Sequence, residues 1–240
     1  MAKDLNQEQQ HLDALAHTYF TVQIAFDKKL IYLGYLTIRS YFEGPNGLEL
    51  GSGDGDMTKF LKNDFERLTV VDASADLLEG IPEEPNLVKI CSLFENYLPQ
   101  EQFNTIIMGH ILEHVEDPVS LFTQVGKWLA PGGKILAIVP NADSFHRLAA
   151  VKMGLLKEPS ELNERDIAVG HRRVYSWERL ARDIELAGLH IIKMGGLFFK
   201  PLSNQQINDY WTDDMIQGFY ELGKEFPKNS AEIFVVCGKL

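Results

Sequence analysis

The feature that most constrains this chain is a glycine-rich segment between a short apolar run and a helical stretch. It reads Leu-Glu-Leu-Gly-Ser-Gly-Asp-Gly over residues 48–55, and the next apolar run ends in Asp72. Glycine has no Cβ, so backbone N–H groups in such a turn can approach a ligand closely. An acidic residue at the tip of the following strand can accept hydrogen bonds from ribose hydroxyls. The segment therefore predicts a nucleoside-binding, doubly wound α/β domain.

The spacing of the glycines limits which class of nucleoside ligand we expect. A dinucleotide fingerprint needs Gly-x-Gly-x-x-Gly, whereas this chain has Gly-x-Gly-x-Gly preceded by Glu49. The pattern Glu-x-Gly-x-Gly-x-Gly resembles motif I of the class I S-adenosylmethionine-dependent methyltransferases. A glycine triplet alone is typical of an ordinary tight turn, but the preceding strand, the following helix and Asp72 favour the binding loop.

Two further segments carry the same resemblance. Residues 107–118 read Ile-Met-Gly-His-Ile-Leu-Glu-His-Val-Glu-Asp-Pro, and 128–136 read Trp-Leu-Ala-Pro-Gly-Gly-Lys-Ile-Leu. Together they look like later motifs of the UbiG-like branch, the type 11/23 methyltransferases. The resemblance implies a three-layer, Rossmann-like α/β fold with seven mostly parallel strands and an antiparallel last strand. It implies nothing firm about the acceptor.

Composition limits the partners and the compartment. The chain has 240 residues, is 45% apolar and carries a formal charge of −11. The negative charge argues against nucleic acid as substrate, because such binding draws on Lys and Arg. There is no run of about eighteen apolar residues and no signal-like start, so we expect no membrane span. Cys91 and Cys237 are interpreted as reduced core residues of a cytoplasmic protein, a monomer or homodimer.

Strands and helices alternate along most of the chain, which favours a parallel sheet covered on both faces. Strands are expected at 47–50, 67–72, 86–90, 103–109 and 133–139, followed by an antiparallel edge pair at 188–197 and 231–239. Helices are expected at 5–20, 24–42, 56–63, 75–80, 118–129 and 204–222.

The helical segment 1–43 has two interpretations that remain open: a lid over the cofactor pocket, or simple packing on one sheet face. The remainder, 44–240, is interpreted as the cofactor-binding domain, with insertions at about 141–175 and 198–229. Both insertions begin near the edge where ligands bind in open α/β sheets, so they are candidates for the acceptor pocket.

The resemblance also implies a set of cofactor-binding residues. The segment from Glu49 would contact the methionine half, and Asp72 the ribose. Ser92 stands where relatives often carry Asp for the adenine, so a backbone contact from Leu93 is the alternative. The complete set is Glu49, Gly51, Ser52, Gly53, Asp72, Ala73, Ser92, Leu93, Met108 and Gly109.

Four residues are candidates for the reaction itself. His110 follows the fourth strand as a general base or acceptor-orienting group, or as a packed helix-start residue. Asn141 could orient a ligand or cap a helix. Tyr175 could turn its ring to the sulfonium, and Ser203 could face the pocket. The pair His110 and His114 has metal-ligand spacing, but a structural role is expected and no metal is predicted.

Methyl transfer is an in-line displacement from an activated sulfonium, so the enzyme mainly aligns the reactants and excludes water. The leading hypothesis is transfer from S-adenosylmethionine to N, O or carboxylate of a small molecule or a peptidic or sugar acceptor, giving S-adenosylhomocysteine. In a second hypothesis the cofactor's own amine attacks its γ-carbon, giving azetidine-2-carboxylate and methylthioadenosine. The third is a non-catalytic cofactor-binding module.

Overall fold

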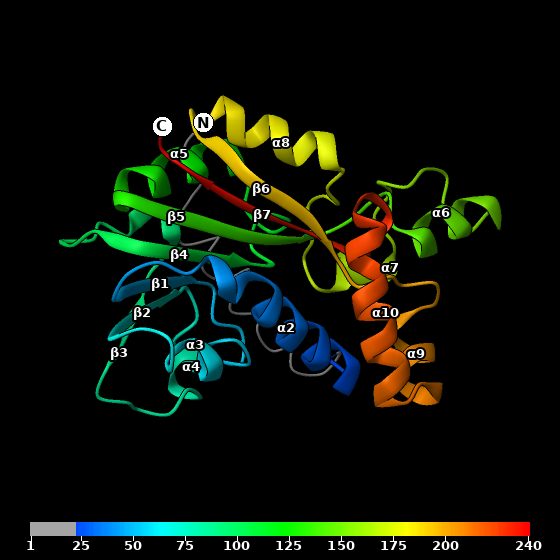
Figure 1. The fold of residues 1–240 in the computed structure, drawn as a ribbon, viewed down its shortest axis with the longest axis horizontal. Coiled ribbons are helices and arrows are strands. Elements are labelled where there is room, and N and C mark those ends of the chain that lie inside the picture. Colours follow the sequence, from blue (N-terminus) through cyan, green and yellow to red (C-terminus); the bar gives the residue numbers. More distant parts are fainter. Residues whose placement is uncertain (1–22) are drawn as a thin grey trace.

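The computed structural model describes residues 23–240, and the helix expected over 5–20 lies outside them. Its centre is a seven-stranded sheet in the order β3-β2-β1-β4-β5-β7-β6 (Figure 1). The strands are β1 (Asn46–Leu50), β2 (Arg67–Asp72), β3 (Leu87–Cys91), β4 (Phe103–Gly109), β5 (Leu129–Pro140), β6 (His190–Leu197) and β7 (Glu232–Gly238). β7 runs antiparallel to both β5 and β6, as expected from the resemblance, and the other ladders are parallel.

Helices cover both faces of the sheet. They are α2 (Ala25–Ile38), α3 (Thr58–Leu61), α4 (Ala75–Glu79), α5 (Pro118–Trp128), α6 (Phe145–Lys152), α7 (Glu164–Ala168), α8 (Trp177–Leu186), α9 (Asn204–Tyr210) and α10 (Asp213–Glu225). Apolar side chains of α2, α3, α9 and α10 share one core with one sheet face, and those of α5 and α8 share a second core with the other (Figure 1). This is the three-layer arrangement that the alternating pattern predicts.

Local capping explains where several helices begin. Asp117 accepts a hydrogen bond from the Ser120 N–H at 2.9 Å, with Pro118 in the first turn of α5. The single helix expected over 204–222 is instead two helices, because the Thr212 hydroxyl caps the first turn of α10. The strand expected over 133–139 begins earlier, at Leu129, and its pairing with β4 shifts register near Phe103.

The reversal of β7 determines which residues share the ligand-binding edge. Glu232, the first residue of β7, pairs with Pro140, the last residue of β5. The start of β7 therefore lies beside the carboxyl ends of the parallel strands, where ligands bind in such sheets.

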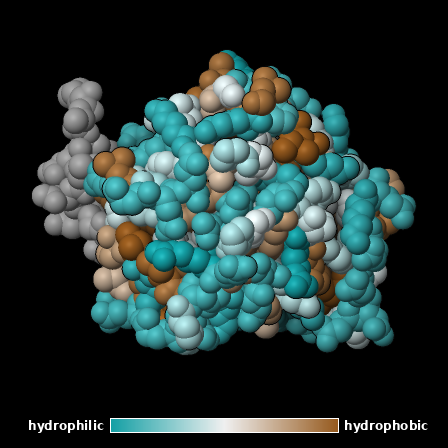
Figure 2. Space-filling model, turned by 60° about the vertical axis from the view of Figure 1, so that its left-hand side comes forward, coloured by the Kyte–Doolittle hydropathy of each residue, from teal (hydrophilic) through white to brown (hydrophobic). Residues whose placement is uncertain are grey.

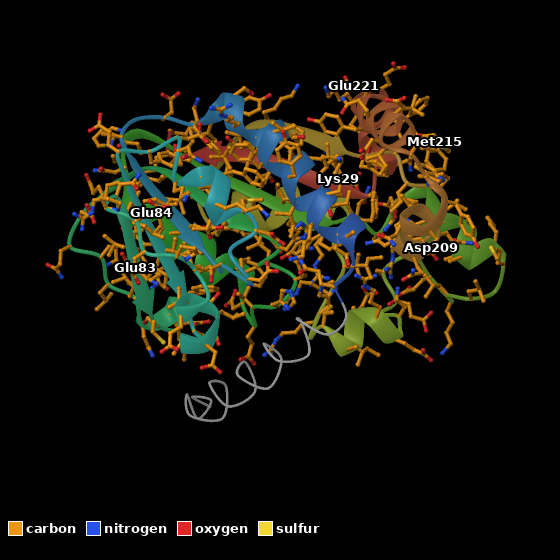
Figure 3. All side chains as sticks on the ribbon, turned by 90° about the horizontal axis from the view of Figure 1, so that it is seen from below. Lys29, Glu83, Glu84, Asp209, Met215 and Glu221 are labelled. Carbon is orange, nitrogen blue, oxygen red and sulfur yellow. The ribbon has the colours of Figure 1, made fainter. Side chains whose placement is uncertain are left out.

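The α2 helix packs along the sheet and against α9. Lys29 makes an ion pair with Asp213 at 2.9 Å, and the Phe26 N–H donates to Asn208 at 3.1 Å. Lys29 lies on α2 near the α9–α10 region in the view from below (Figure 3). The role of 1–43 as a lid stays a prediction, since residues 1–22 lie outside the described part.

The two cysteines have different surroundings. Cys237 is buried in β7, whereas Cys91 is exposed, so the expectation of a core position was wrong for Cys91. The reason is topological, because β3 is an edge strand of the sheet. Within residues 23–240, no helix has the length and apolar character needed to cross a bilayer. One face is mainly hydrophilic, with apolar side chains in small separate groups (Figure 2).

Candidate active site

A cavity of about 960 Å³ opens at the carboxyl edge of the sheet. Its wall is formed by the glycine loop, the tips of β2, β4 and β5, the start of β7, the first turns of α2, and parts of both predicted insertions. Segments far apart in the sequence therefore meet around one space.

The glycine loop has the geometry that only glycine adopts without strain. Gly51 has φ +77°, and a Cβ there would lie 2.1 Å from Cδ1 of Ile111. Its N–H donates to the Val71 carbonyl at 2.8 Å, which fixes the loop to β2. The loop backbone is thus held against the cavity with no side chain in the way.

Asp72 is fixed at the tip of β2 by three hydrogen bonds. One carboxylate oxygen accepts from the Ser52 N–H at 2.8 Å and from its hydroxyl at 3.1 Å; the other accepts from the Ser74 N–H at 2.9 Å. These bonds use three of the roughly four acceptor sites of the carboxylate, so about one site on Oδ1 remains. The carboxylate can therefore accept a further hydrogen bond from a ligand hydroxyl.

Glu49 precedes the glycine loop and contacts the helix that follows it. Its side chain is buried and accepts a hydrogen bond from the Thr58 hydroxyl at 2.7 Å. Burial, with a smaller contribution from Asp72, raises the pKa of Glu49 to about 8 even though the Thr58 bond opposes the shift. Glu49 thus connects the end of β1 to the start of α3.

The structure brings most of the predicted cofactor residues together. The cavity wall contains Glu49, Gly51, Ser52, Gly53, Asp72, Ala73, Leu93 and Gly109. Ser92 and Met108 do not line it. The Ser92 hydroxyl donates to the Leu93 carbonyl at 2.9 Å. Met108 lies in the core that the sheet shares with α5 and α8. Its neighbour Ile107 lies in the other core, because successive side chains of a strand alternate between the two faces.

His110 lines the cavity directly after β4, in a left-handed backbone conformation with φ +57°. Its Nδ1 is 3.4 Å from Glu113 Oε1, and its Nε2 is 3.7 Å from Glu232 Oε1. Burial alone would lower the pKa of His110, but the two carboxylates raise it to about 9. His110 therefore carries a proton at neutral pH, and a protonated imidazole can donate a hydrogen bond but cannot accept a proton.

The other three reaction candidates have different positions. Asn141 lines the cavity, but its side-chain amide donates to the carbonyls of Lys228 and Ser230 at 2.9 and 2.8 Å. Ser203 lines it too, with its hydroxyl capping α9. Tyr175 is fully buried outside the cavity, and its hydroxyl donates to Asp183 at 3.2 Å. The three are not gathered around one point.

Sequence reasoning missed several residues near His110. Glu232 was within a predicted strand. Its position at the start of an antiparallel strand was the signal that could have placed it beside the carboxyl end of β5. Lys200 lines the cavity from the loop before α9 and donates to Asn204 at 2.6 Å. Burial lowers the pKa of Lys200 to about 8. Asp27 of α2 joins them through Asn204, which donates to it at 2.6 Å.

The basic residues of the first insertion mainly hold that insertion together. Arg147 donates to Asp166 at 3.0 Å and to the Pro159 carbonyl at 2.7 Å. His171 lies 3.2 Å from the other Asp166 oxygen. Arg173 donates to backbone carbonyls of the loop after β4, including that of Leu112 at 2.7 Å. These contacts fix the insertion against the cavity.

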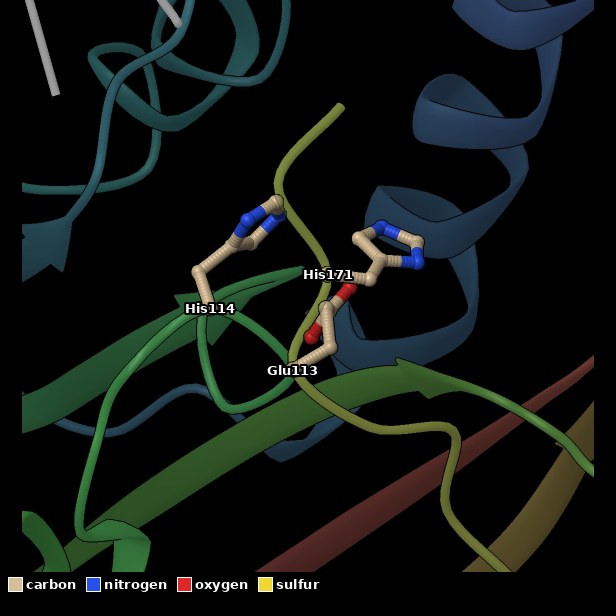
Figure 4. Close-up of side chains that lie close together, drawn as sticks. All are labelled: Glu113, His114 and His171. Carbon is tan, nitrogen blue, oxygen red and sulfur yellow. The ribbon is translucent and has the colours of Figure 1, made fainter. Parts of the chain in front are cut away.

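Glu113, His114 and His171 are the described residues that could hold a metal ion, since one ligand atom of each lies within 4.8 Å of the others. Figure 4 shows the three side chains gathered where the loop after β4 meets the first insertion. The imidazole rings also pack edge to face at 4.9 Å. Burial lowers the pKa of His114 to about 4, so its ring is neutral. Carboxylate and neutral imidazole are common ligands of divalent metals, so the predicted structural role and a metal role both fit this geometry.

Comparison with known proteins identifies the family. A family described as "Methyltransferase domain" matches residues 27–194. The chain belongs to the class I S-adenosylmethionine-dependent methyltransferases. The family membership fits the cofactor-binding role expected for the glycine loop and Asp72 of this methyltransferase, and that role stays a prediction.

Relatives and solved structures agree on the fold. The methyltransferase is 24% identical to a ubiquinone biosynthesis O-methyltransferase of Xylella fastidiosa over 185 residues, 73% of each chain. An S-adenosylmethionine-dependent methyltransferase from Mesorhizobium loti superposes with a TM-score of 0.62 at 16% identity, covering 85% of this chain and 97% of that one. The N-methyltransferase NodS of Bradyrhizobium japonicum, in complex with S-adenosylhomocysteine, gives 0.56 at 16% identity, with 94% and 96% covered.

Proposed function

We propose that this methyltransferase transfers the sulfonium methyl group of S-adenosylmethionine to nitrogen, oxygen or carboxylate of a small-molecule acceptor. The observation that carries the proposal is one continuous cavity of about 960 Å³ whose wall includes both the glycine loop and His110. Ligand pockets of roughly 300–1,000 Å³ hold drug-sized molecules, so the space suits a cofactor and a small acceptor.

The arrangement supports alignment as the main catalytic contribution. With Asp72 holding the ribose, the cofactor would extend from β2 across β1, and its sulfonium would face the end of β4. The acceptor would enter from the side of the two insertions, opposite the leaving sulfur. Alignment and water exclusion are the effects that this displacement requires, because the sulfonium is already an activated leaving group.

The relatives leave the acceptor atom open. The Xylella relative is an O-methyltransferase and NodS is an N-methyltransferase. The cyclisation hypothesis gains no support from the geometry, because it needs polar groups around the cofactor's amine. Tyr175 lies outside the cavity, and the polar groups of Asn141 and Ser203 have partners within the protein.

Two measurements test the proposal. Calorimetry should detect binding of S-adenosylmethionine and S-adenosylhomocysteine. Asp72→Asn should weaken both about tenfold or more, because hydrogen bonds to a charged group contribute about 1.5–3 kcal/mol. Mass spectrometry of reactions with the cofactor alone should show no methylthioadenosine. Absence of cofactor binding, or methylthioadenosine formed without an acceptor, would contradict the proposal.

A further inference from the structure

Three buried carboxylate oxygens at the acceptor end have no hydrogen-bond partner within the described part of the chain. They are both oxygens of Glu113 and Oε2 of Glu232. Glu113 is 0% exposed and Glu232 is 7% exposed, and both line the cavity. Buried polar atoms are nearly always hydrogen-bonded. Glu113 Oε1 has the His110 ring at 3.4 Å, whereas Glu113 Oε2 and Glu232 Oε2 lack a donor that a ligand can supply.

The two carboxylates lie where the methyl group would be transferred. Glu113 is in the loop after β4, and Glu232 begins β7 at the same edge. The imidazole of His110 lies between them, 3.4 Å from one and 3.7 Å from the other. A cofactor held by Asp72 and the glycine loop would direct its sulfonium toward this group.

The surrounding charges leave these carboxylates open to a ligand. Asp27 of α2 is already paired with Arg165 of α7 at 2.6 Å. Lys200 faces Glu232 from the loop before α9, but its ammonium donates to Asn204. His110 is the cation in closest contact. A cationic nitrogen with several N–H donors would satisfy the unpartnered oxygens, whereas an oxyanion would be repelled by both carboxylates.

We propose that the acceptor of this site is an amine, received as an ammonium group by Glu113 and Glu232, and that Glu232 accepts its proton. This inference rests on the proposed methyl transfer. One N–H proton moves to Glu232, and the freed nitrogen lone pair forms the new N–C bond. The C–S bond breaks with its electron pair going to sulfur, which leaves S-adenosylhomocysteine and a methylated ammonium.

Charge conservation explains why the site suits nitrogen. In transfer to a neutral amine the positive charge moves from sulfur to nitrogen and stays beside Glu113, which is still a carboxylate after Glu232 has taken the proton. In transfer to an oxyanion the two charges cancel, and the attraction to Glu113 and Glu232 is lost as the reaction proceeds. A site selective for the transition state of amine methylation gains from placing fixed negative charge at this point.

The test compares three cofactor ligands: S-adenosylmethionine, S-adenosylhomocysteine and sinefungin, an analogue with an amine-bearing carbon in place of the methyl-bearing sulfur. We expect the wild type to bind sinefungin about tenfold more tightly than S-adenosylhomocysteine. Glu232→Gln and Glu113→Gln should each remove most of this preference. Their affinity for S-adenosylhomocysteine should change less than about twofold, which also shows that the variants are folded.

Glu95→Gln is the matched control. Glu95 lines the cavity two residues beyond Leu93, the predicted adenine contact, so its substitution removes the same charge without touching Glu113 or Glu232, and any effect should be equal for the three ligands. An unchanged sinefungin preference in both glutamine variants would overturn the amine assignment while leaving the cofactor site intact. If the wild type binds none of the three ligands, the proposed function itself fails.

A product assay provides the second arm. Reactions are run with matched amines and phenols, and S-adenosylhomocysteine release is measured. Turnover of an amine but not of its phenol counterpart supports the assignment, and faster turnover of the phenol overturns it.

Discussion

Substitution of Gly51 by alanine gives a quantitative test of how the glycine loop is built. Alanine at 51 meets two separate penalties: a left-handed backbone at φ +77°, and a Cβ placed 2.1 Å from Cδ1 of Ile111. Gly132 is a natural reference, because it has φ +75° and nothing within 4 Å of its added Cβ. Gly132→Ala therefore measures the backbone penalty alone.

The two penalties have different sizes. The left-handed conformation costs about 1–2 kcal/mol for alanine, offset by about 0.4–1 kcal/mol from a less flexible unfolded chain. Both substitutions share these contributions. The contact with Ile111 adds a cost of about 0.5–1.5 kcal/mol at Gly51 only, because Cδ1 is the end of a flexible side chain that can move off its rotamer. Gly51→Ala should thus lower the free energy of unfolding by about 0.5–1.5 kcal/mol more than Gly132→Ala does.

Urea unfolding of four proteins checks this: wild type, Gly51→Ala, Ile111→Val and the double variant. Valine at 111 lacks Cδ1, and the nearest remaining atom of Ile111, Cγ1, is 3.1 Å from the added Cβ. The double variant should recover most of the contact penalty, which appears as a coupling free energy. Equal losses for Gly51→Ala and Gly132→Ala, or zero coupling with Ile111→Val, would refute the steric argument.

Two further predictions follow from the acceptor end. The pKa of His110 is raised from 6.5 to about 9, so its stabilising effect is complete below about pH 6.5 and is lost as the pH rises through 9. The difference in unfolding free energy between wild type and His110→Asn should fall over this range, and a pH-independent difference would contradict it. Asp27→Asn removes the charge from the contact between α2 and α7 and should speed release of S-adenosylhomocysteine about two- to fivefold in stopped-flow experiments. Lys29→Ala, on a part of α2 that does not line the cavity, should leave this rate unchanged.

The sequence was sufficient to predict the sheet, because each strand is a short apolar run bounded by turn residues. It was less informative where side chains act locally. The Thr212 cap divides the helix expected over 204–222. The early start of β5 at Leu129 depends on pairing with β4, which no local pattern reveals.

The sequence was a better guide to the cavity-lining residues near the glycine loop than to those around His110. The glycine loop and Asp72 are close in sequence and belong to one strand-helix-strand unit. Residues such as Glu232 and Lys200 meet His110 only through the order of the strands and the path of the insertions. Tyr175 illustrates the difficulty, since its residue type suited the pocket but its side chain packs in the core beneath the other sheet face.

The reversed direction of β7 has a practical consequence for handling the protein. The strand starts at the cavity with Glu232 and runs away from it, so Leu240 ends the chain at the far side of the sheet from α7 and α9 (Figure 1). An affinity tag or surface linker fused after Leu240 would therefore leave the mouth of the cavity unobstructed, and immobilised enzyme should take up small molecules as freely as enzyme in solution.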